Sequence, residues 1–259
     1  MKRNLAIFFM GMTIATMVLG GCGDKENISK KDGKQSESVE DKKTFTVGFD
    51  AEYPPYGYMD ENGEYTGFDL ELAEAVCELE GWELVKKPIN WDSKDMELNS
   101  GAIDCIWNGF TMNGREEEYT FSTPYVDNSQ VIVVAEKSGM KTLEDLQGKS
   151  VGVQAASAAL DLLQSEEEGG QKALADTFSA LNEFADYNTA FTELQAGALD
   201  ALAIDVGVAN YQIKSRGEGY QILEETLNTE QYAIGFKKGN QELCDVVNAD
   251  LKKLTEDGT

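Results

Sequence analysis

Hydrophobic and polar positions alternate along the chain from Thr44 onward in short blocks that predict strands and helices in turn. Phe45, Val47 and Phe49 have the period of two that is typical of a strand, and the apolar residues of 68–79 have the helical period. Strands that alternate with helices predict an α/β architecture with mostly parallel sheets. Further strands are predicted at 82–89, 103–107, 130–135, 151–153, 201–204 and 232–236.

Residues with helix-capping chemistry place the ends of several predicted helices. Gly81 is placed to end the first helix, and Thr142 opens a capping box for a short helix. Ser157 is placed to cap a third helix and Asn188 to cap the next one. The pattern over 242–254 predicts a closing helix.

The N-terminal region has a different pattern. A basic start is followed by an apolar run over 5–19, which is shorter than the roughly 20 apolar residues that span a bilayer. This pattern is typical of a secretory signal peptide, and the small residues before Cys22 resemble a lipobox, in which that cysteine is acylated. We therefore expect a signal peptide at 1–21 and a lipidated Cys22 that anchors the protein on the outside of the cell membrane, with a polar, flexible tether over 22–43. An ordinary signal peptide with a chance cysteine and an uncleaved membrane anchor are the alternatives.

Composition excludes several classes of function. The formal net charge is −25, which repels nucleic acid phosphates and anionic lipid surfaces, so no nucleic acid partner is expected. The sequence contains no histidine, which removes His-based general bases, Ser-His-Asp triads and most zinc sites. No glycine-rich nucleotide loop occurs. We expect neither a cofactor nor a metal.

Three cysteines follow Cys22, and their spacing is too wide for a metal-ligand pair. We expect Cys77, Cys105 and Cys244 to be small, buried apolar side chains. Because the expected compartment lies outside the cytoplasm, one disulfide among them is left open.

Polar residues gather at three places where predicted strands end, which is where open α/β sheets bind ligands. These places are 50–56, 108–115 and Asp205. A zwitterionic amino acid needs a guanidinium for its carboxylate and a fixed carboxylate for its ammonium. Arg115 and Asp205 would supply these two groups. The candidate residues of the first two segments are Asp50, Tyr53, Asn108, Gly109, Thr111 and Arg115.

The residues alone leave simpler interpretations open. Arg115 is followed by three glutamates, which also fits a surface ion pair. Asp205 precedes a predicted helix, which also fits an N-cap. Tyr53 and Tyr56 flank two prolines, which also fits packing within a turn.

The order of these segments decides between the interpretations, because it resembles one family. The sequence is similar to the bacterial solute-binding proteins of the polar amino acid type from Thr44 to the end. The resemblance implies an α/β, two-lobed, periplasmic-binding-protein-like (type II) fold with two hinge strands and a cleft between the lobes. We expect lobe 1 at 44–129 plus 233–259 and lobe 2 at 130–232. The segments that carry the resemblance are 47–56, 67–70, 109–111 with Arg115, 121–125 and 200–205.

The family pattern implies a role for each residue of the ligand site. Arg115 would bind the ligand α-carboxylate with help from Gly109 and Thr111, and Asp205 would bind the α-ammonium. The remaining candidates are Tyr53 against the ligand, Asp50 towards its side chain, Ser157 as a second-lobe group for the carboxylate, Trp91 as a wall, and Trp107 as a wall or a core residue.

The chain departs from the family pattern in three places. The segment 112–115 is one residue shorter than the common loop, and Ala155 to Ser157 stands where relatives often have a glycine. The sequence stops at Thr259, where relatives usually continue into a final helix, which leaves open whether it is a C-terminally truncated fragment.

The resemblance implies the substrate-binding lipoprotein of an ABC importer, a monomer that captures a free polar amino acid and delivers it to a membrane permease. Asp50 and the acidic charge favour a basic or amide side chain. We expect no enzyme activity. A dehydratase-type enzyme of the same fold and a ligand-sensing module are the other classes, and the missing histidine argues against the first.

Overall fold

The computed structural model describes Val39 and residues 42–259. The predicted signal peptide at 1–21, Cys22 and nearly all of the predicted tether lie outside the described residues. In the part of the chain that is described, no helix has both the length and the apolar character needed to cross a bilayer.

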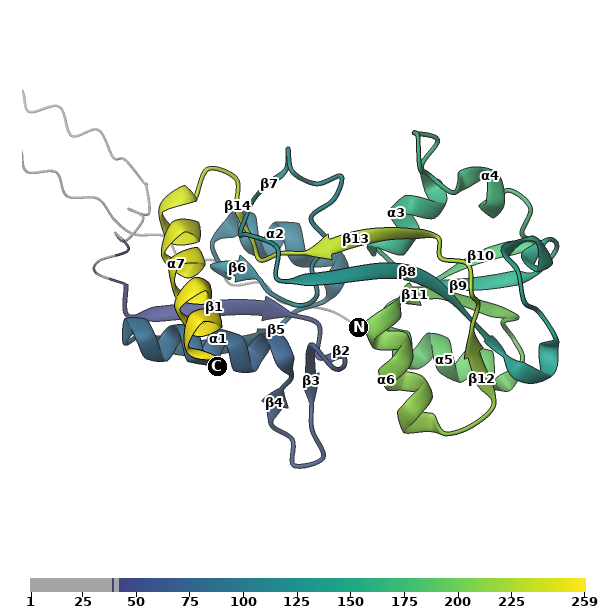
Figure 1. Cartoon of the computed structure of the whole chain (residues 1–259), viewed down its shortest axis with the longest axis horizontal. Helices are drawn as coiled ribbons and strands as arrows, with labels where there is room; N and C mark the ends of the chain where they lie inside the picture. Colours follow the sequence, from purple (N-terminus) through teal and green to yellow (C-terminus); the bar gives the residue numbers. More distant parts are fainter. Residues whose placement is uncertain (1–38, 40–41) are drawn as a thin grey trace, which may run out of the picture. The chain divides into compact units, whose positions relative to one another are not determined.

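Strands and helices alternate along the described chain, which confirms the α/β prediction (Figure 1). The strands are β1 (Thr44–Phe49), β2 (Glu52–Tyr53), β3 (Gly57–Met59), β4 (Tyr65–Thr66), β5 (Glu83–Pro88), β6 (Cys105–Ile106), β7 (Tyr119–Phe121), β8 (Val126–Ala135), β9 (Ser150–Gln154), β10 (Ala180–Phe184), β11 (Ala201–Asp205), β12 (Tyr220–Ile222), β13 (Asn228–Tyr232) and β14 (Gly235–Lys237). The α-helices are α1 (Phe68–Glu80), α2 (Lys94–Ser100), α3 (Ala158–Gln164), α4 (Lys172–Ala175), α5 (Tyr187–Ala196), α6 (Val206–Arg216) and α7 (Gln241–Asp257). Short 3₁₀ helices are η2 (Trp91–Ser93), η3 (Glu136–Ser138) and η4 (Leu143–Leu146).

A five-stranded sheet in the order β5-β1-β6-β14-β7 organises the first set of elements, which we call lobe 1. Strand β1 pairs in parallel with β5 and β6, whereas β14 is antiparallel to β6 and β7. Helices α1 and α7 pack their apolar residues, among them Val76 and Val247, with the side chains of β1. A second cluster joins Leu98 of α2 to Ile106 of β6. The sheet therefore has helices on both faces.

A six-stranded sheet organises the second set of elements, which we call lobe 2. Its order is β10-β9-β11-β8-β12, with β13 also paired to β8. Residues of β11 alternate between two cores, because successive side chains of a strand point to opposite faces. Leu202 and Ile204 pack with α5 and α6, and Ala201 and Ala203 pack with α3.

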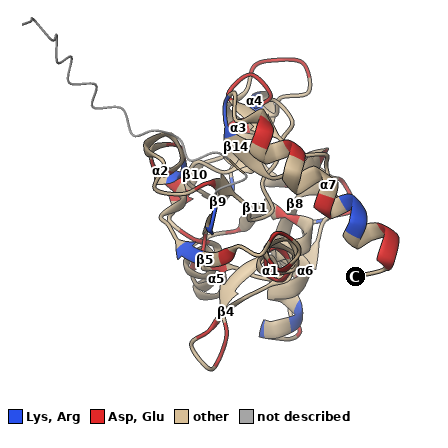
Figure 2. Cartoon of the chain, turned by 90° about the vertical axis from the view of Figure 1, so that its left-hand side faces the viewer, with Lys and Arg blue, Asp and Glu red and all other residues tan. Residues whose placement is uncertain are grey.

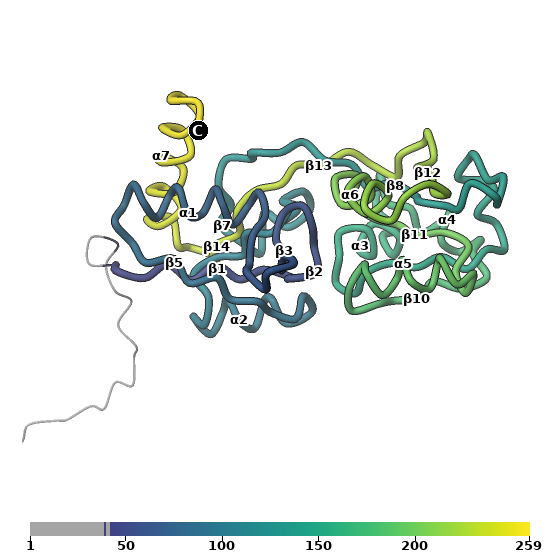
Figure 3. The backbone as a smooth tube through the Cα atoms, turned by 90° about the horizontal axis from the view of Figure 1, so that it is seen from below, coloured from purple at the N-terminus to yellow at the C-terminus, as the bar shows by residue number. Residues whose placement is uncertain are grey.

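Strands β8 and β13 are the two segments that connect the lobes. They form an antiparallel pair from Val126↔Tyr232 to Gln130↔Asn228. Figures 1 and 3 show both segments running from the elements of lobe 1 to those of lobe 2. The chain passes from β7 of lobe 1 into β8, and returns from β13 into β14 of lobe 1. Residues near this pair are therefore well placed to respond to a change in the angle between the lobes.

Most of the predicted helix caps are confirmed. Gly81 ends α1 in the left-handed conformation, Thr142 forms a capping box with Asp145, and the Ser157 hydroxyl accepts the Leu160 N–H at 3.2 Å. The prediction of Asn188 as a cap is wrong. Asp186 caps α5 by accepting the Thr189 N–H at 2.7 Å.

Three patterns differ from the sequence-based expectation. The sheets are mixed rather than mostly parallel, because β8 and β14 run against their neighbours. The strand predicted over 232–236 is two strands, since β13 pairs in lobe 2 and β14 pairs in lobe 1. Phe68 and Leu79 are half-exposed on α1, and Leu70 and Cys77 are buried in their place.

The cysteines and the acidic residues agree more closely with what the sequence led us to expect. Cys77, Cys105 and Cys244 are buried and free, so the disulfide that the sequence left open does not form in this structure. Acidic residues outnumber basic ones by 47 to 22. Figure 2 shows them on α7 and on the loops near α4 and β4, which accounts for the acidic surface.

Candidate functional site

Residues of both lobes enclose a small cavity of about 10 Å³, which we call the central cavity. This volume has room for about one water molecule. It brings together seven of the ten candidate residues. The lining residues are Tyr53, Trp91, Gly109, Thr111 and Arg115 from lobe 1, and Gln154, Ser157, Ala158 and Asp205 from lobe 2.

Arg115 reaches from lobe 1 to lobe 2. One guanidinium nitrogen, Nη2, donates to Asp161 Oδ2 at 2.6 Å, and the guanidinium carbon lies 5.1 Å from the ring centre of Phe110. The Arg115 side chain is 11% exposed and that of Asp161 is 62% exposed. Arg115 therefore forms an ion pair, as one interpretation of the sequence held, but it does so from a buried position against the cavity.

Asp205 lies at the end of β11 and is 3% exposed. It occupies the N-cap position of α6, but its side chain makes no capping bond. One carboxylate oxygen instead accepts from Asn128 Nδ2 at 2.9 Å, Gln130 Nε2 at 2.7 Å and the Tyr232 hydroxyl at 2.6 Å. Burial, followed by the charge of Glu230, raises the pKa of Asp205 to about 6.

Glu230 is a second buried carboxylate beside Asp205, and the sequence-based reasoning missed it. Its Oε1 accepts from Asn128 Nδ2 and Gln130 Nε2, both at 2.8 Å, so both carboxylates share the same two donors. The Thr111 hydroxyl also donates to Glu230 Oε1 at 2.7 Å. No lysine or arginine among the described residues forms an ion pair with either carboxylate. This end of the cavity is therefore rich in hydrogen-bond acceptors and suits a cationic group.

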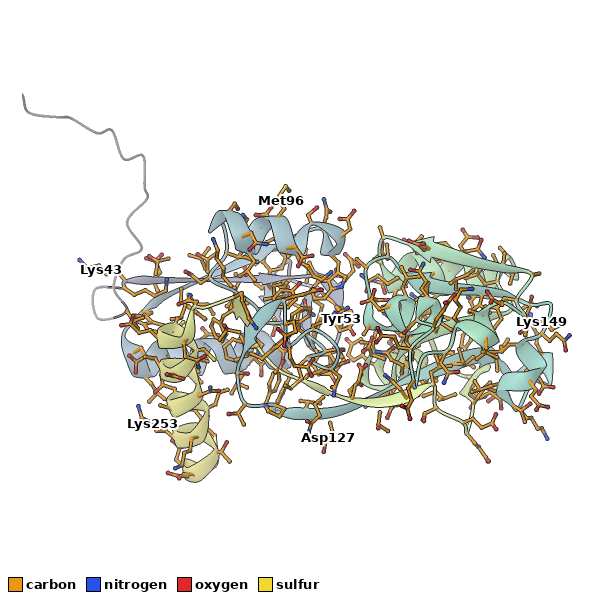
Figure 4. The ribbon with its side chains drawn as sticks, turned by 90° about the horizontal axis from the view of Figure 1, so that it is seen from above. Lys43, Tyr53, Met96, Asp127, Lys149 and Lys253 are labelled. Carbon is orange, nitrogen blue, oxygen red and sulfur yellow. The ribbon has the colours of Figure 1, made fainter. Side chains whose placement is uncertain are left out.

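Gly109 allows the loop after β6 to approach two tyrosines. Its φ is 55°, and a Cβ at this position would meet ring carbons of Tyr53 and Tyr232 at 3.0 Å. Its N–H donates to Asp69 Oδ2 at 2.5 Å. Tyr53 is buried, and Figure 4 shows it on the side of lobe 1 that faces lobe 2. A side chain at position 109 would displace a tyrosine that lines the cavity.

Ser157 and Gln154 form the wall on the side of lobe 2. The Ser157 hydroxyl donates to Gln154 O at 2.7 Å while it caps α3. Gln154 Nε2 donates across the lobes to Asp50 Oδ2 at 2.7 Å. Gln154 was not predicted, and its position directly after a buried strand, beside the predicted Ser157 loop, is the pattern that would have found it.

Asp50 and Asn108 lie next to the central cavity rather than in its lining. Asn108 Oδ1 accepts the Asp50 N–H at 2.5 Å, which fixes the start of the Asp50 loop. Burial raises the pKa of Asp50 to about 6. Trp107 is fully buried in the core of lobe 1, as its core interpretation held.

A larger cavity of about 520 Å³ shares Trp91 with the central cavity, and we call it the acidic side cavity. Five carboxylates line it and no lysine or arginine does. Another cavity of about 510 Å³ shares Thr111, Arg115 and Ala158 with the central cavity. Among residues 42–259, no cluster of three or more acidic or cysteine side chains is arranged to hold a metal ion. The five carboxylates are Asp50, Glu52, Asp92, Glu97 and Asp186.

Known proteins resemble the chain over nearly all of its described length. The L-cystine-binding protein TcyA of Bacillus subtilis (strain 168) is 30% identical over 100% of this chain and 94% of its own length. A substrate-binding protein of an ABC uptake transporter from Streptococcus pneumoniae, solved with bound histidine, is 35% identical, with a TM-score of 0.78 over 83% of this chain and 88% of that one. An ancestral arginine-binding protein bound to arginine is 37% identical, with a TM-score of 0.75 over 83% and 94% of the two chains.

These likenesses confirm the two-lobed solute-binding fold and give no support to the enzyme alternative, since the similar proteins bind solutes. Residues 45–259 match the bacterial extracellular solute-binding proteins, family 3. That match covers far more than half of the chain. The chain therefore belongs to this family of extracellular solute-binding proteins.

Proposed function

We propose that the chain is the substrate-binding lipoprotein of an ABC importer, which captures a free polar amino acid and delivers it to a membrane permease. The observation that carries the proposal is the pair of opposite charges, Arg115 and Asp205, in the lining of one cavity. An α-amino acid carries the complementary carboxylate and ammonium. Relatives named for cystine, arginine and glutamine support an amino acid as the ligand class.

Binding works by closure of the lobes around the ligand. A volume of about 10 Å³ is far below the roughly 300 Å³ of a small ligand pocket, so the lobes separate before an amino acid enters. The proposed lobes are 44–129 plus 233–259 and 130–232, with β8 and β13 as hinge strands. A ligand that contacts both lobes only in the closed form shifts the population towards that form. Two or three charge-assisted hydrogen bonds, less the ordering cost, give about −8 kcal/mol, or micromolar affinity.

The ligand side chain points into the acidic side cavity. Asp50 and Asp92 line this cavity without a lysine or arginine partner among the described residues, whereas Glu97 pairs with Lys87. This charge favours a basic or amide side chain over an acidic one. The preference is weaker than that for the amino acid backbone, because part of the acidic charge is hydrogen-bonded within the protein. Gln154 holds Asp50 at 2.7 Å, and Asn188 holds Glu52.

The lipid anchor and the monomeric state complete the proposal. Cys22 at the end of the apolar N-terminal run supports acylation and attachment to the outside of the cell membrane. The test is a Cys22→Ser variant in cells, which should move the protein from the membrane fraction to the soluble fraction. Retention of the variant in the membrane fraction contradicts the lipoprotein assignment. A single-protomer mass in light scattering checks the monomer.

Function is tested by a thermal-shift screen of the purified protein against the common amino acids, cystine and ornithine. Bound ligand is first removed by partial unfolding and refolding. A ligand of the native state raises the melting temperature by mass action, so one chemical group of amino acids should give a large upward shift. A folded protein that no amino acid stabilises contradicts the proposal.

A further inference from the structure

Lys94 is a buried cation for which the described residues provide no carboxylate partner. It is the first residue of α2 and is 5% exposed. Among residues 42–259, no carboxylate oxygen lies within 4.0 Å of its Nζ. Its Nζ donates instead to the Ala156 carbonyl at 3.1 Å. Buried lysines are rare unless they are paired, so this position calls for an anion from elsewhere.

The surroundings of Lys94 make its charge unfavourable. Burial lowers the pKa of Lys94, and the nearby Arg115 lowers it further. The first turn of a helix also disfavours a positive charge. Asp161 acts in the opposite direction on the pKa of Lys94, but it pairs with Arg115 at 2.6 Å and is largely exposed. The charges of Asp95, Asp161 and Asp92 raise the pKa of Lys94, but none of these carboxylates lies within 4.0 Å of its Nζ. A ligand carboxylate in direct contact would therefore give Lys94 an ion pair that the described residues do not provide.

The ammonium of Lys94 lies beside residues that line the central cavity and the acidic side cavity, while Lys94 itself is in neither lining. Its Nζ is 5.2 Å from the ring centre of Trp91, which lines both cavities. Its acceptor, Ala156, stands between Ala155, which lines the side cavity, and Ser157, which lines the central cavity. Lys94 therefore lies beside the wall that a ligand in the site of the proposed function would contact.

The backbone that receives Lys94 is itself constrained. Ala156 has a φ of 54°, and it is the one non-glycine residue with positive φ in the described chain. This conformation costs energy for a residue with a Cβ. The Lys94–Ala156 hydrogen bond joins α2 of lobe 1 to the loop before α3 of lobe 2. The contact thus exists only when the lobes are close, and it holds the ammonium at the cavity.

We propose that Lys94 is a second cationic residue for the ligand α-carboxylate, beside Arg115. The inference rests on the proposed function and deepens it, because it defines the ligand by a free carboxylate. Lys94 has three N–H donors, of which Ala156 takes one, so two are available to carboxylate oxygens. An amine or amide that lacks the carboxylate would leave Lys94 without an ion-pair partner, which excludes such compounds as good ligands.

The test compares Lys94→Met with the wild type in calorimetric titrations. The probes are L-arginine, L-cystine, L-glutamine and L-histidine, each with its α-amide. For the amino acid that binds the wild type, Lys94→Met should weaken binding at least tenfold, about 1.4 kcal/mol. The affinity for the α-amide should change less than twofold, since no carboxylate faces position 94. Lys94→Arg, which keeps the charge, should recover most of the loss.

Lys43→Met is the matched control, because Lys43 is exposed and lies at the outer end of lobe 1, far from Tyr53 in Figure 4. It should bind as the wild type does. An unchanged affinity of Lys94→Met, or an equal loss for acid and amide, overturns the assignment of Lys94. If no amino acid of the thermal-shift screen binds the wild type, the proposed function itself fails, which is a different result.

Discussion

The two ends of the central cavity carry opposite charges and are built in different ways. At the positive end, Arg115 and Lys94 extend from lobe 1 and contact Asp161 and Ala156 of lobe 2. At the negative end, Asp205 accepts hydrogen bonds from residues of the hinge strands β8 and β13. The contacts at the positive end therefore depend on how close the lobes are, whereas the hydrogen bonds at the negative end depend on strand register.

This difference separates two tasks of a binding protein. The pairing of β8 with β11 and β13 does not cross the cleft, so we expect Asp205 and Glu230 to remain an acceptor-rich site when the lobes open. The contacts of Arg115 and Lys94 with lobe 2 cross the cleft and are lost on opening. A ligand carboxylate that replaces these contacts gains binding free energy from both lobes only in the closed form. We infer that the negative end selects ligands that carry an ammonium group. The positive end couples ligand binding to closure of the lobes.

The largest effect should come from removing the main cation. Arg115→Ala is expected to weaken amino acid binding at least 100-fold, because the change deletes charge-assisted hydrogen bonds to the carboxylate. The fold should stay intact, since the partner of Arg115 is the exposed Asp161. Calorimetric titration measures the affinity, and circular dichroism checks the fold. An unchanged affinity would remove Arg115 from the site.

Asp205→Asn should weaken binding about 10- to 100-fold and change the pH dependence of stability in a defined direction. The folded-state pKa of Asp205 is raised to about 6 from 3.8. The ligand-free wild type therefore loses stability as pH rises from about 4 to about 6, because the unfolded chain ionises first. Asn does not ionise, so the variant should keep this part of the free energy of unfolding. It should be more stable than the wild type at pH 7 by about 1–3 kcal/mol.

Binding should show the opposite trend with pH, because the ligand ammonium needs ionised Asp205. Wild-type affinity should rise as pH increases through about 6, and the contribution of Asp205 to this rise should be absent in the variant. Urea unfolding and calorimetry between pH 4 and 8 measure both trends. A variant less stable than the wild type at pH 7 would show that the carboxylate stabilises the free protein, contrary to this account.

The smallest effect should come from the partner of Arg115. Asp161→Asn frees the guanidinium from a competing carboxylate, so amino acid affinity should rise, by up to about fivefold. The effect is limited because the Asp161 side chain is 62% exposed, and exposed ion pairs contribute about 0.2–1 kcal/mol. Titrations at low and high salt should show the gain shrinking as salt screens the pair. A tenfold weaker affinity would instead make Asp161 part of the closed-state clamp.

Local chemistry explains which parts of the fold the sequence predicted. Thr142, Ser157 and Gly81 act within a few residues of their own position, so their capping roles were predicted correctly. Asn188 and Asp186 are two short polar residues at the start of one helix, and local pattern does not separate them. Asp186 became the cap, while Asn188 bonds with Glu52 of lobe 1. The choice depended on a contact distant in sequence.

The strand prediction over 232–236 failed for a related reason. Tyr232 ends the pairing of β13 with β8, and Gly235 begins the pairing of β14 with lobe 1. The apolar run is continuous in the sequence because both halves are buried. Hydrophobic periodicity indicates which residues are buried, but it does not indicate which sheet a residue joins. The passage of the chain from lobe 2 to lobe 1 between β13 and β14 could therefore not be predicted from it.

The sequence by itself determined the family, the α/β class and the residue types of the site, because Arg115, Asp205 and their flanking loops carry their chemistry in short motifs. Only the tertiary structure decided that Glu230 shares donors with Asp205 and that Lys94 lies buried beside Trp91, with no ion-pair partner among the described residues. Neither residue belongs to the motifs that carry the resemblance. Burial and the absence of a counter-charge are properties of packing, and a linear pattern does not contain them.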